Sequence, residues 1–165
     1  MTGCAVPRVG SHAVILELGS AHRFDITHRA LVMGILNRTP DSFFDGGAYF
    51  DFDAFLRKAE SLVAEGADFL DVGGMKAGPG PEVTVQEEMD RVIPAVEALR
   101  SRFDVPLSVD TFRASVLREA LRAGAQIGND ISGFADPDYL RAAAEHGASV
   151  VATHIRLAPR IPDPQ

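Results

Sequence analysis

The sequence predicts an α/β fold, a (β/α)8 barrel that is truncated after about its fifth strand. Apolar runs of strand length alternate with amphipathic segments of helical period. The runs are nearly continuous in apolar residues, as in strands buried on both faces of a parallel sheet. A polar residue closes each of the five runs, at Asn37, Asp71, Asp110, Asn129-Asp130 and His154.

These strand ends favour a barrel over an open doubly wound sheet. Consecutive strands of a barrel place their carboxyl ends around one rim, so all five polar positions would converge on a shared pocket. An open sheet would gather only those near its switch point. No G-x-G-x-x-G follows a strand, which further weakens the open-sheet alternative.

The elements follow in order along the chain. Residues 1–29 are expected to form a hairpin, because the runs His12–Leu18 and His22–Ile26 flank Gly19-Ser20. Residues 30–156 hold the first five β/α units, with strands expected at 30–37, 69–73, 106–111, 126–131 and 149–155. Helices are expected at 53–66, 84–103, 114–123 and 136–146. Residues 157–165 are expected to be a Pro-rich coil tail.

Glycines and prolines predict where the helices end. Gly66, Gly124 and Gly147 follow three of the amphipathic segments and are suited to close them. Pro94 predicts a kink or a break within the second helix. Asp136-Pro137 is expected to start the fourth helix as N-cap and first position.

Composition limits the classes of function. The chain has 165 residues, which suits one domain, and a net charge of −7, which disfavours binding to nucleic acid or to an anionic membrane. Cys4 is the only cysteine, so an internal disulfide is excluded and a cytoplasmic location is expected. No apolar run approaches the roughly 20 residues of a membrane span, and no secretory signal is visible.

The stretch after the first barrel strand offers oxygen ligands. Asn37, Asp41 and Asp45 carry hard oxygens suited to Mg²⁺ or to a developing cation. The alternative is that residues 39–42 are turn chemistry and that nearby aspartates cap a helix.

Two aspartates and an asparagine end later strands. A carboxylate at Asp71 or Asp110 can accept N–H bonds from a heterocycle, and the alternative for each is a capping role. Because strand side chains alternate, Asn129 and Asp130 point to opposite faces. We expect Asn129 to face the barrel interior and Asp130 to brace the backbone outside.

The histidines indicate a functional site less clearly than the polar residues at the strand ends do. His154, beside Arg156, could act as an acid or base, bind a metal, or simply be hydrogen-bonded structure. The other four, His12, His22, His28 and His146, are expected to face solvent. No Cys/His cluster has zinc-binding spacing.

Four stretches together resemble the dihydropteroate synthase family: MGILNRTPDSFFDGG (33–47), GADFLDVGG (66–74), PLSVDT (106–111) and GNDISG (128–133). The resemblance implies a TIM barrel and a transferase of folate biosynthesis. In that reaction 6-hydroxymethyl-7,8-dihydropterin pyrophosphate loses pyrophosphate with the help of Mg²⁺, and p-aminobenzoate captures the pterin cation.

The resemblance also implies roles for individual residues. Asn37 matches the position that meets Mg²⁺ and pyrophosphate, and Asp45 matches the carboxylate that supports the cation. Asp110 and Asn129 match groups that bind the pterin ring.

The chain departs from the family in two respects. The family's second loop reads G-G-E-S-T-R-P-G, whereas Met75, Lys76, Ala77 and Gly78 replace its Glu, Ser, Thr and Arg. The loop therefore resembles that of a divergent, inactive second type of homologue in actinobacteria. Strands six to eight, which supply a pterin-binding Asp, a Lys and an Arg-x-His pair in the family, are also absent. Open strand edges predict association, with a homo-oligomer expected.

Two functions follow from these observations. The first is an enzyme of the dihydropteroate synthase type, with activity placed in doubt by residues 75–78 and by the missing strands. The alternative is a non-catalytic pterin-binding or protein-interaction homologue that keeps Asn37, Asp45, Asp110 and Asn129.

Overall fold

The computed structural model describes residues 13–39, 48–76 and 80–154. Five parallel strands form one sheet in the order β3-β4-β5-β6-β7: Met33–Asn37, Phe69–Gly73, Leu107–Asp110, Ile127–Asp130 and Ser149–Ala152. Each strand pairs with the one that follows it in the sequence, so the order contains no reversal. Such sequential pairing is the pattern of a barrel and lacks the switch point of a doubly wound sheet. The described strands therefore form part of a (β/α)8 barrel.

The register brings the carboxyl ends of the strands to one level. Asn37 lies opposite Gly73, Gly73 opposite Asp110, and Asp110 opposite Asn129. These four rim residues therefore lie on neighbouring strands, although they are spread over more than ninety residues of sequence.

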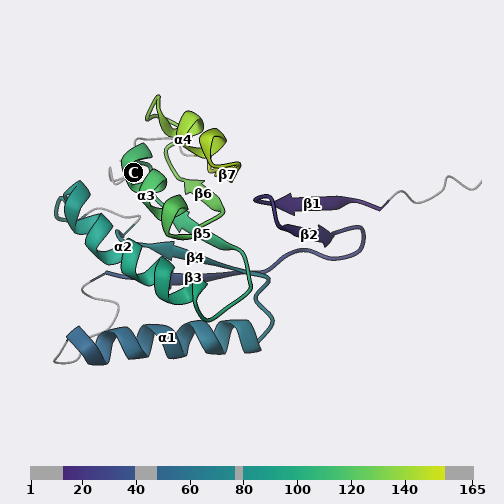
Figure 1. The fold of residues 1–165 in the computed structure, drawn as a ribbon, viewed down its shortest axis with the longest axis horizontal. Coiled ribbons are helices and arrows are strands. Elements are labelled where there is room, and N and C mark those ends of the chain that lie inside the picture. The colour runs from purple at the N-terminus through teal and green to yellow at the C-terminus, as the bar shows by residue number, and fades with distance from the viewer. Residues whose placement is uncertain (1–12, 40–47, 77–79, 155–165) are drawn as a thin grey trace, which may run out of the picture.

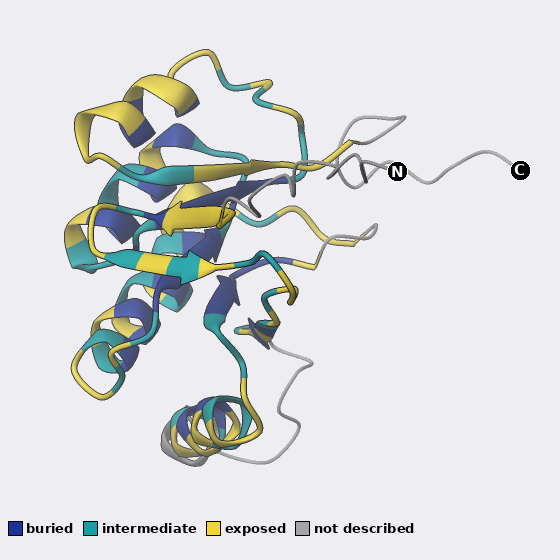
Figure 2. Ribbon diagram, turned by 90° about the vertical axis from the view of Figure 1, so that its right-hand side faces the viewer, coloured by how far each residue is buried: buried dark blue, intermediate teal, exposed yellow. Residues whose placement is uncertain are grey.

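In the described part of the chain, four helices connect the strands and cover the outer face of the sheet. They are α1 (Ala48–Ala64), α2 (Val85–Arg100), α3 (Ala114–Ala123) and α4 (Tyr139–Glu145), and Figure 1 shows them following one another from the bottom of the view to its top. Figure 2 shows that the helices combine buried residues with exposed ones, as amphipathic helices do.

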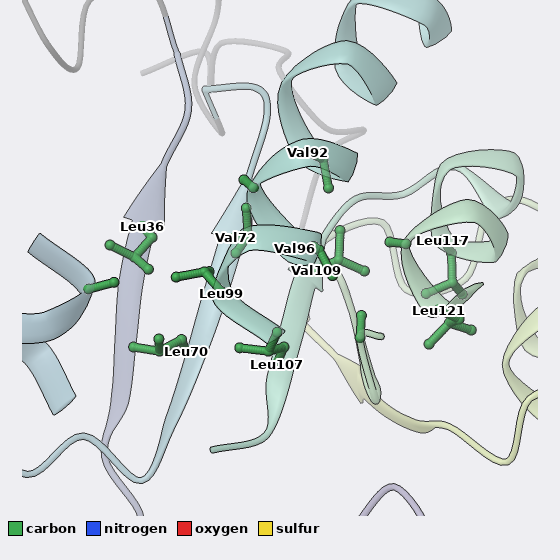
Figure 3. Packing of buried hydrophobic residues seen from close by; sticks show 14 of the residues in the cluster. Leu36, Leu70, Val72, Val92, Val96, Leu99, Leu107, Val109, Leu117 and Leu121 are labelled. Atoms are coloured by element: carbon green, nitrogen blue, oxygen red, sulfur yellow. The ribbon is translucent and has the colours of Figure 1, made fainter. Parts of the chain in front are cut away.

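The core lies between this outer face and the helices. Leu70 and Val72 of β4 and Leu107 and Val109 of β5 are fully buried. Figure 3 shows them against residues of α2 and α3, among them Val92, Val96, Leu99, Leu117 and Leu121. The residues that alternate with these strand leucines and valines point to the other face, which is the barrel interior.

Helix α2 keeps its continuity through Pro94. Its N-terminus carries a capping box, in which Thr84 and Glu87 each bind the other's backbone N–H. The expected break does not occur, because Val92, Ala95, Val96 and Leu99 are fully buried on both sides of the proline and hold the helix against the sheet.

Helix α4 begins later than the sequence suggested, at Tyr139 instead of Asp136. The carboxylate of Asp136 is used elsewhere: Oδ2 accepts the backbone N–H of Ala114 at 2.8 Å and Oδ1 that of Asp138 at 3.0 Å. Asp136 therefore caps the start of α3, which has no cap from its own N-cap residue. Helix α1 also differs, since it begins at Ala48, five residues before the expected start.

The strands β1 (Ile15–Leu18) and β2 (His22–Asp25) pair antiparallel beside the amino ends of the sheet. Ser149 accepts a hydrogen bond from the Gly19 backbone, and His22 Nε2 donates one to the carbonyl of Asp104 at 3.0 Å. His22 is thus half-buried and structural, contrary to the expectation that it faces solvent. His28 and His146 are exposed, and His12 lies outside the described residues.

Within the described residues, no helix has the length and apolar character needed to cross a membrane.

Candidate ligand site at the rim of the sheet

A cavity of about 370 Å³ opens on the inner face at the carboxyl ends of the strands. Its lining comes from β3, β4, β5 and β6 and from the residues that directly follow β3 and β4. It consists of Met33, Ile35, Asn37, Thr39, Asp71, Met75, Lys76, Asp110 and Asn129. Among the predicted site residues, Asn37, Met75, Lys76, Asp110 and Asn129 are therefore brought together. Asp45, Ala77 and Gly78 lie outside the described residues.

The deep part of the cavity holds an aspartate hydrogen-bonded to an asparagine. Nδ2 of Asn129 donates to Oδ2 of Asp71 at 3.1 Å, and both residues are buried. Asn129 faces the cavity as expected. Asp130 faces the other side, where its two carboxylate oxygens accept the backbone N–H groups of Ser132 at 2.6 Å and Phe134 at 2.7 Å. This neighbour thus braces the β6–α4 turn.

The carboxyl group of Asp110 has a pKa far above its ordinary value. Burial, followed by repulsion from Asp71, Glu88 and Asp130, raises its pKa to about 7. Burial also raises the pKa of Asp71, although the hydrogen bond from Asn129 opposes that effect. Near neutral pH, Asp110 is therefore populated both as a carboxylic acid, which can donate, and as a carboxylate, which only accepts.

Because Gly73 has no side chain, there is open space beside two oxygen atoms of the rim. A Cβ atom at this position would lie 3.2 Å from Oδ1 of Asn37 and 3.4 Å from Oδ2 of Asp110. An amide oxygen and a carboxylate oxygen are hard ligands that suit Mg²⁺. No group of three or more His, Cys, Asp or Glu side chains among the described residues could hold a metal by itself. Asn37 and Asp110 thus offer two oxygen ligands, fewer than a metal site built from side chains alone requires.

The altered loop contributes two described residues to the cavity. The side chain of Met75 is buried, with 7% exposed, and that of Lys76 is exposed. Nη1 of Arg91 donates to the carbonyl of Gly74 at 3.0 Å, which ties the start of this loop to α2. A hydrophobic side chain and a cation thus stand at positions 75 and 76, where the dihydropteroate synthase pattern has a carboxylate and a hydroxyl.

A buried ion pair behind the rim was missed from the sequence. Glu88 of α2 is fully buried, and its Oε2 accepts a hydrogen bond from Nη1 of Arg113 at 2.8 Å. Nη2 of Arg113 donates to the carbonyl of Val83 at 2.7 Å. Burial raises the pKa of Glu88, while Thr111 and Arg113 lower it. The signal was present, because Glu88 precedes Val92 by four residues on the apolar stripe of α2.

His154 does not belong to the main cavity. It is exposed and lines a separate hollow of about 290 Å³ with Ser132, Gly133, Ala152 and Thr153. Arg156 lies outside the described residues.

Comparisons with known proteins agree with this geometry. Residues 33–165 match the family model described as pterin binding enzyme. The chain is 47% identical over 139 residues to the dihydropteroate synthase of Synechocystis sp., covering 83% of the chain and 48% of that protein. It is 53% identical over 127 residues to the inactive dihydropteroate synthase 2 of Mycobacterium leprae, covering 76% and 44%.

A solved structure supports the fold. The dihydropteroate synthase of Burkholderia cenocepacia, complexed with 7,8-dihydropteroate, superimposes with a TM-score of 0.76 at 41% identity, covering 93% of the chain and 51% of the solved protein. The chain thus spans about half the length of the relatives it matches. The sequence match and the shared barrel architecture place the chain in the pterin binding enzyme family.

Proposed function

We propose that the chain is a dihydropteroate synthase-like protein of folate biosynthesis that binds 6-hydroxymethyl-7,8-dihydropterin pyrophosphate in the rim cavity. The observation that carries this proposal is the clustering of Asp110, Asn129 and Asp71 at one end of a 370 Å³ cavity. Carboxylate and amide groups in a partly open site are suited to a flat heterocycle with several N–H donors and ring acceptors.

Each polar group has a part in binding the pterin. Asp110 accepts N–H bonds from the ring as a carboxylate. Asn129 offers an N–H and a C=O at the ring edge, with its orientation set by Asp71. Asn37 would hold Mg²⁺ together with the pyrophosphate, and the bound ion would neutralise charge on the leaving pyrophosphate. The predicted roles of Asn37, Asp110 and Asn129 are retained in this proposal, as is that of Asp45 in supporting the cation.

Titration calorimetry with the pterin pyrophosphate and Mg²⁺ tests binding directly. We expect micromolar affinity for the unaltered chain and a loss of about tenfold or more for Asn129→Ala, because a ligand N–H or C=O loses its partner. Glu119→Ala, at a half-buried position of α3 that does not line the cavity, is the control and should bind like the unaltered chain. A folded protein with no measurable affinity would contradict the proposal.

A second candidate is a pterin-binding protein without synthase activity. It is favoured by Met75 and Lys76 at the cavity, and by the similarity to a relative named as inactive. Pyrophosphate release in the presence of p-aminobenzoate separates the two. Binding without turnover supports the non-catalytic protein, and turnover supports the enzyme.

Restoring the family residues at positions 75–78 tests whether this loop is responsible for a loss of synthase activity. The combined change Met75→Glu, Lys76→Ser, Ala77→Thr and Gly78→Arg is expected to produce turnover if the loop alone is responsible. Turnover that stays absent, with the pterin still bound, would place the defect outside residues 75–78.

We also propose a cytoplasmic location and self-association. The single cysteine supports the first. The second is supported by β3 and β7, the outer strands of the described sheet, each of which pairs with one neighbouring strand only among the described residues. Sedimentation analysis of the purified chain tests the oligomeric state.

A further inference from the structure

The chain that leaves β3 alternates between the rim cavity and α1. Asn37, the last residue of β3, and Thr39 both line the cavity. Arg38 lies between them, and side chains along an extended chain point alternately to opposite sides. The guanidinium carbon of Arg38 lies 5.0 Å from the ring centre of Phe52 and 5.5 Å from that of Phe55, both in α1. Arg38 therefore contacts α1 while its two neighbours face the cavity.

Phe52 and Phe55, called the aromatic pair below, form one surface. Their rings stack, with centroids 5.8 Å apart and an angle of 16° between the planes. Phe55 is fully buried in the core, so the packing of α1 against the sheet fixes this surface. A guanidinium within about 6 Å of a ring centre is attracted by the ring quadrupole, and more strongly where water is excluded. The aromatic pair thus gives Arg38 a rigid point of attachment.

The backbone of Arg38 is held at the same place. Its N–H donates to the carbonyl of Gly73 at 2.7 Å, which continues the pairing of β3 with β4 one residue beyond Asn37. The chain is therefore held by β4 through its backbone and by α1 through its side chain. A rotation that turned Asn37 and Thr39 away from the cavity would break both contacts.

We propose that Arg38 is a positioning residue, whose contact with the aromatic pair keeps Asn37 and Thr39 directed into the cavity. This inference deepens the proposed function and, where it concerns ligand binding, rests on it. The ring-binding groups Asp110 and Asn129 lie on other strands, β5 and β6. Loss of the contact therefore weakens the hold on the diphosphate, which the proposed function places beside Asn37, and spares the ring.

The alternative role for Arg38 is packing alone. A residue that only packs affects the stability of the whole sheet, and any effect on binding is the same for all ligands. A positioning residue acts locally at the end of β3, and it acts on the ligand through Asn37. Its effect on binding therefore disappears once Asn37 is replaced, because the two substitutions then remove the same interaction.

Amide hydrogen exchange of the 165-residue chain, followed by NMR, tests the anchor without a ligand. We expect Arg38→Met to lower the protection of the amide at position 38 roughly tenfold, because the chain opens there more often, and to leave β5 and β6 within about twofold. Phe52→Leu keeps the arginine and should have the same local effect. Arg57→Met, at an exposed position of α1, is the control and should change neither region. An equal loss throughout the sheet, or none at position 38, would overturn the proposal.

Titration calorimetry tests the effect on the site with 6-hydroxymethyl-7,8-dihydropterin pyrophosphate and with 6-hydroxymethyl-7,8-dihydropterin, each with Mg²⁺. We expect Arg38→Met and Phe52→Leu each to weaken the pyrophosphate ligand by about five- to tenfold and the other by no more than about twofold. In an Asn37→Ala background, Arg38→Met should cost less than about twofold. Arg38→Lys should recover part of the loss, since an ammonium group is also attracted to aromatic rings.

The outcomes separate this inference from the proposed function. If the unaltered chain binds neither ligand, the proposed function fails, and hydrogen exchange still decides about the anchor. Equal losses for both ligands, or an undiminished loss in the Asn37→Ala background, would overturn the positioning role and leave the pterin site standing. A loss for Arg38→Met that Phe52→Leu does not reproduce would overturn it too, because the arginine charge would then act on the ligand directly.

Discussion

Asn129 and Asp71 are joined by a buried hydrogen bond, from Nδ2 of the amide to Oδ2 of the carboxylate, across 58 residues of sequence and 3.1 Å of space. An ionised carboxylate accepts hydrogen bonds and donates none, so it selects the orientation in which the amide turns its NH₂ group toward Asp71. Asp71 thereby determines which hydrogen-bonding groups Asn129 presents to a ligand.

Replacement of Asp71 by asparagine should no longer restrict the Asn129 amide to one orientation. An asparagine accepts or donates, so the Asn129 amide can bond to it in either of two orientations. We expect Asp71→Asn to weaken the pterin pyrophosphate by about tenfold in calorimetry. Asp104→Asn, at an exposed carboxylate outside the cavity, is the control. An unchanged affinity for Asp71→Asn would contradict this role.

Asp110 should make the stability of the fold depend on pH. Its pKa in the folded protein, about 7, lies above the ordinary value of 3.8. The folded state therefore binds the proton more tightly than the unfolded state between these values, so stability falls as the pH rises through this window. We expect the melting temperature of Asp110→Asn, relative to that of the unaltered chain, to rise from pH 4 to pH 8. A difference that stays constant with pH would contradict the assignment.

Replacing only one partner of the Glu88–Arg113 ion pair should lower the free energy of unfolding. Arg113→Ala leaves the fully buried Glu88 carboxylate without its cation, and we expect a loss of about 3–5 kcal/mol in the free energy of unfolding. Urea denaturation measures it. The paired change Glu88→Met with Arg113→Met should recover much of that loss, because no uncompensated charge remains buried.

Arg141→Ala is the matched control for this pair. Arg141 bonds to Asp138 and lies near Glu145 with 64% of its side chain exposed. A surface pair of this kind contributes about 0–1 kcal/mol. A cost for Arg113→Ala within the range of the control would refute the structural importance of the buried pair.

Gly128 and Tyr139 offer a test of packing on the outer face of β6. A Cβ at position 128 would lie 2.7 Å from the hydroxyl oxygen of Tyr139 and 2.9 Å from Cδ1 of Leu117. We expect Gly128→Ala to destabilise the fold by about 1–3 kcal/mol, as overpacking does. Thermal and urea denaturation measure the change.

Tyr139→Phe provides the second half of this test. The hydroxyl is buried and has no hydrogen-bond partner among the described residues, so its removal should be neutral or stabilising. Combined with Gly128→Ala, it should reduce the cost of the added methyl group. Additive effects of the two changes would show that the hydroxyl is not the source of the strain.

The periodicity of the sequence predicted the strands and helices because it reflects which faces are buried. The predicted bounds match the structure for β4 (69–73) and α3 (114–123), whereas α2 spans 85–100 instead of the predicted 84–103. The start of α4 was misjudged because Asp136 looks like a local N-cap, whereas its carboxylate caps α3 across 22 residues. Pro94 similarly predicts a break in α2 from local sequence. The helix continues because packing along its whole length outweighs the effect of the proline.

Local sequence determined which residues stand at the strand ends, including Asn37, Asp110 and Asn129, and which loop positions depart from the family pattern. Only the tertiary structure decided how they combine: that Asp71 orients Asn129, that Glu88 is buried against Arg113, and that Lys76 lines the cavity. The reason is physical. Periodicity records the burial of each residue along its own element, whereas hydrogen bonds, ion pairs and raised pKa values depend on which other elements the parallel pairing of strands brings alongside.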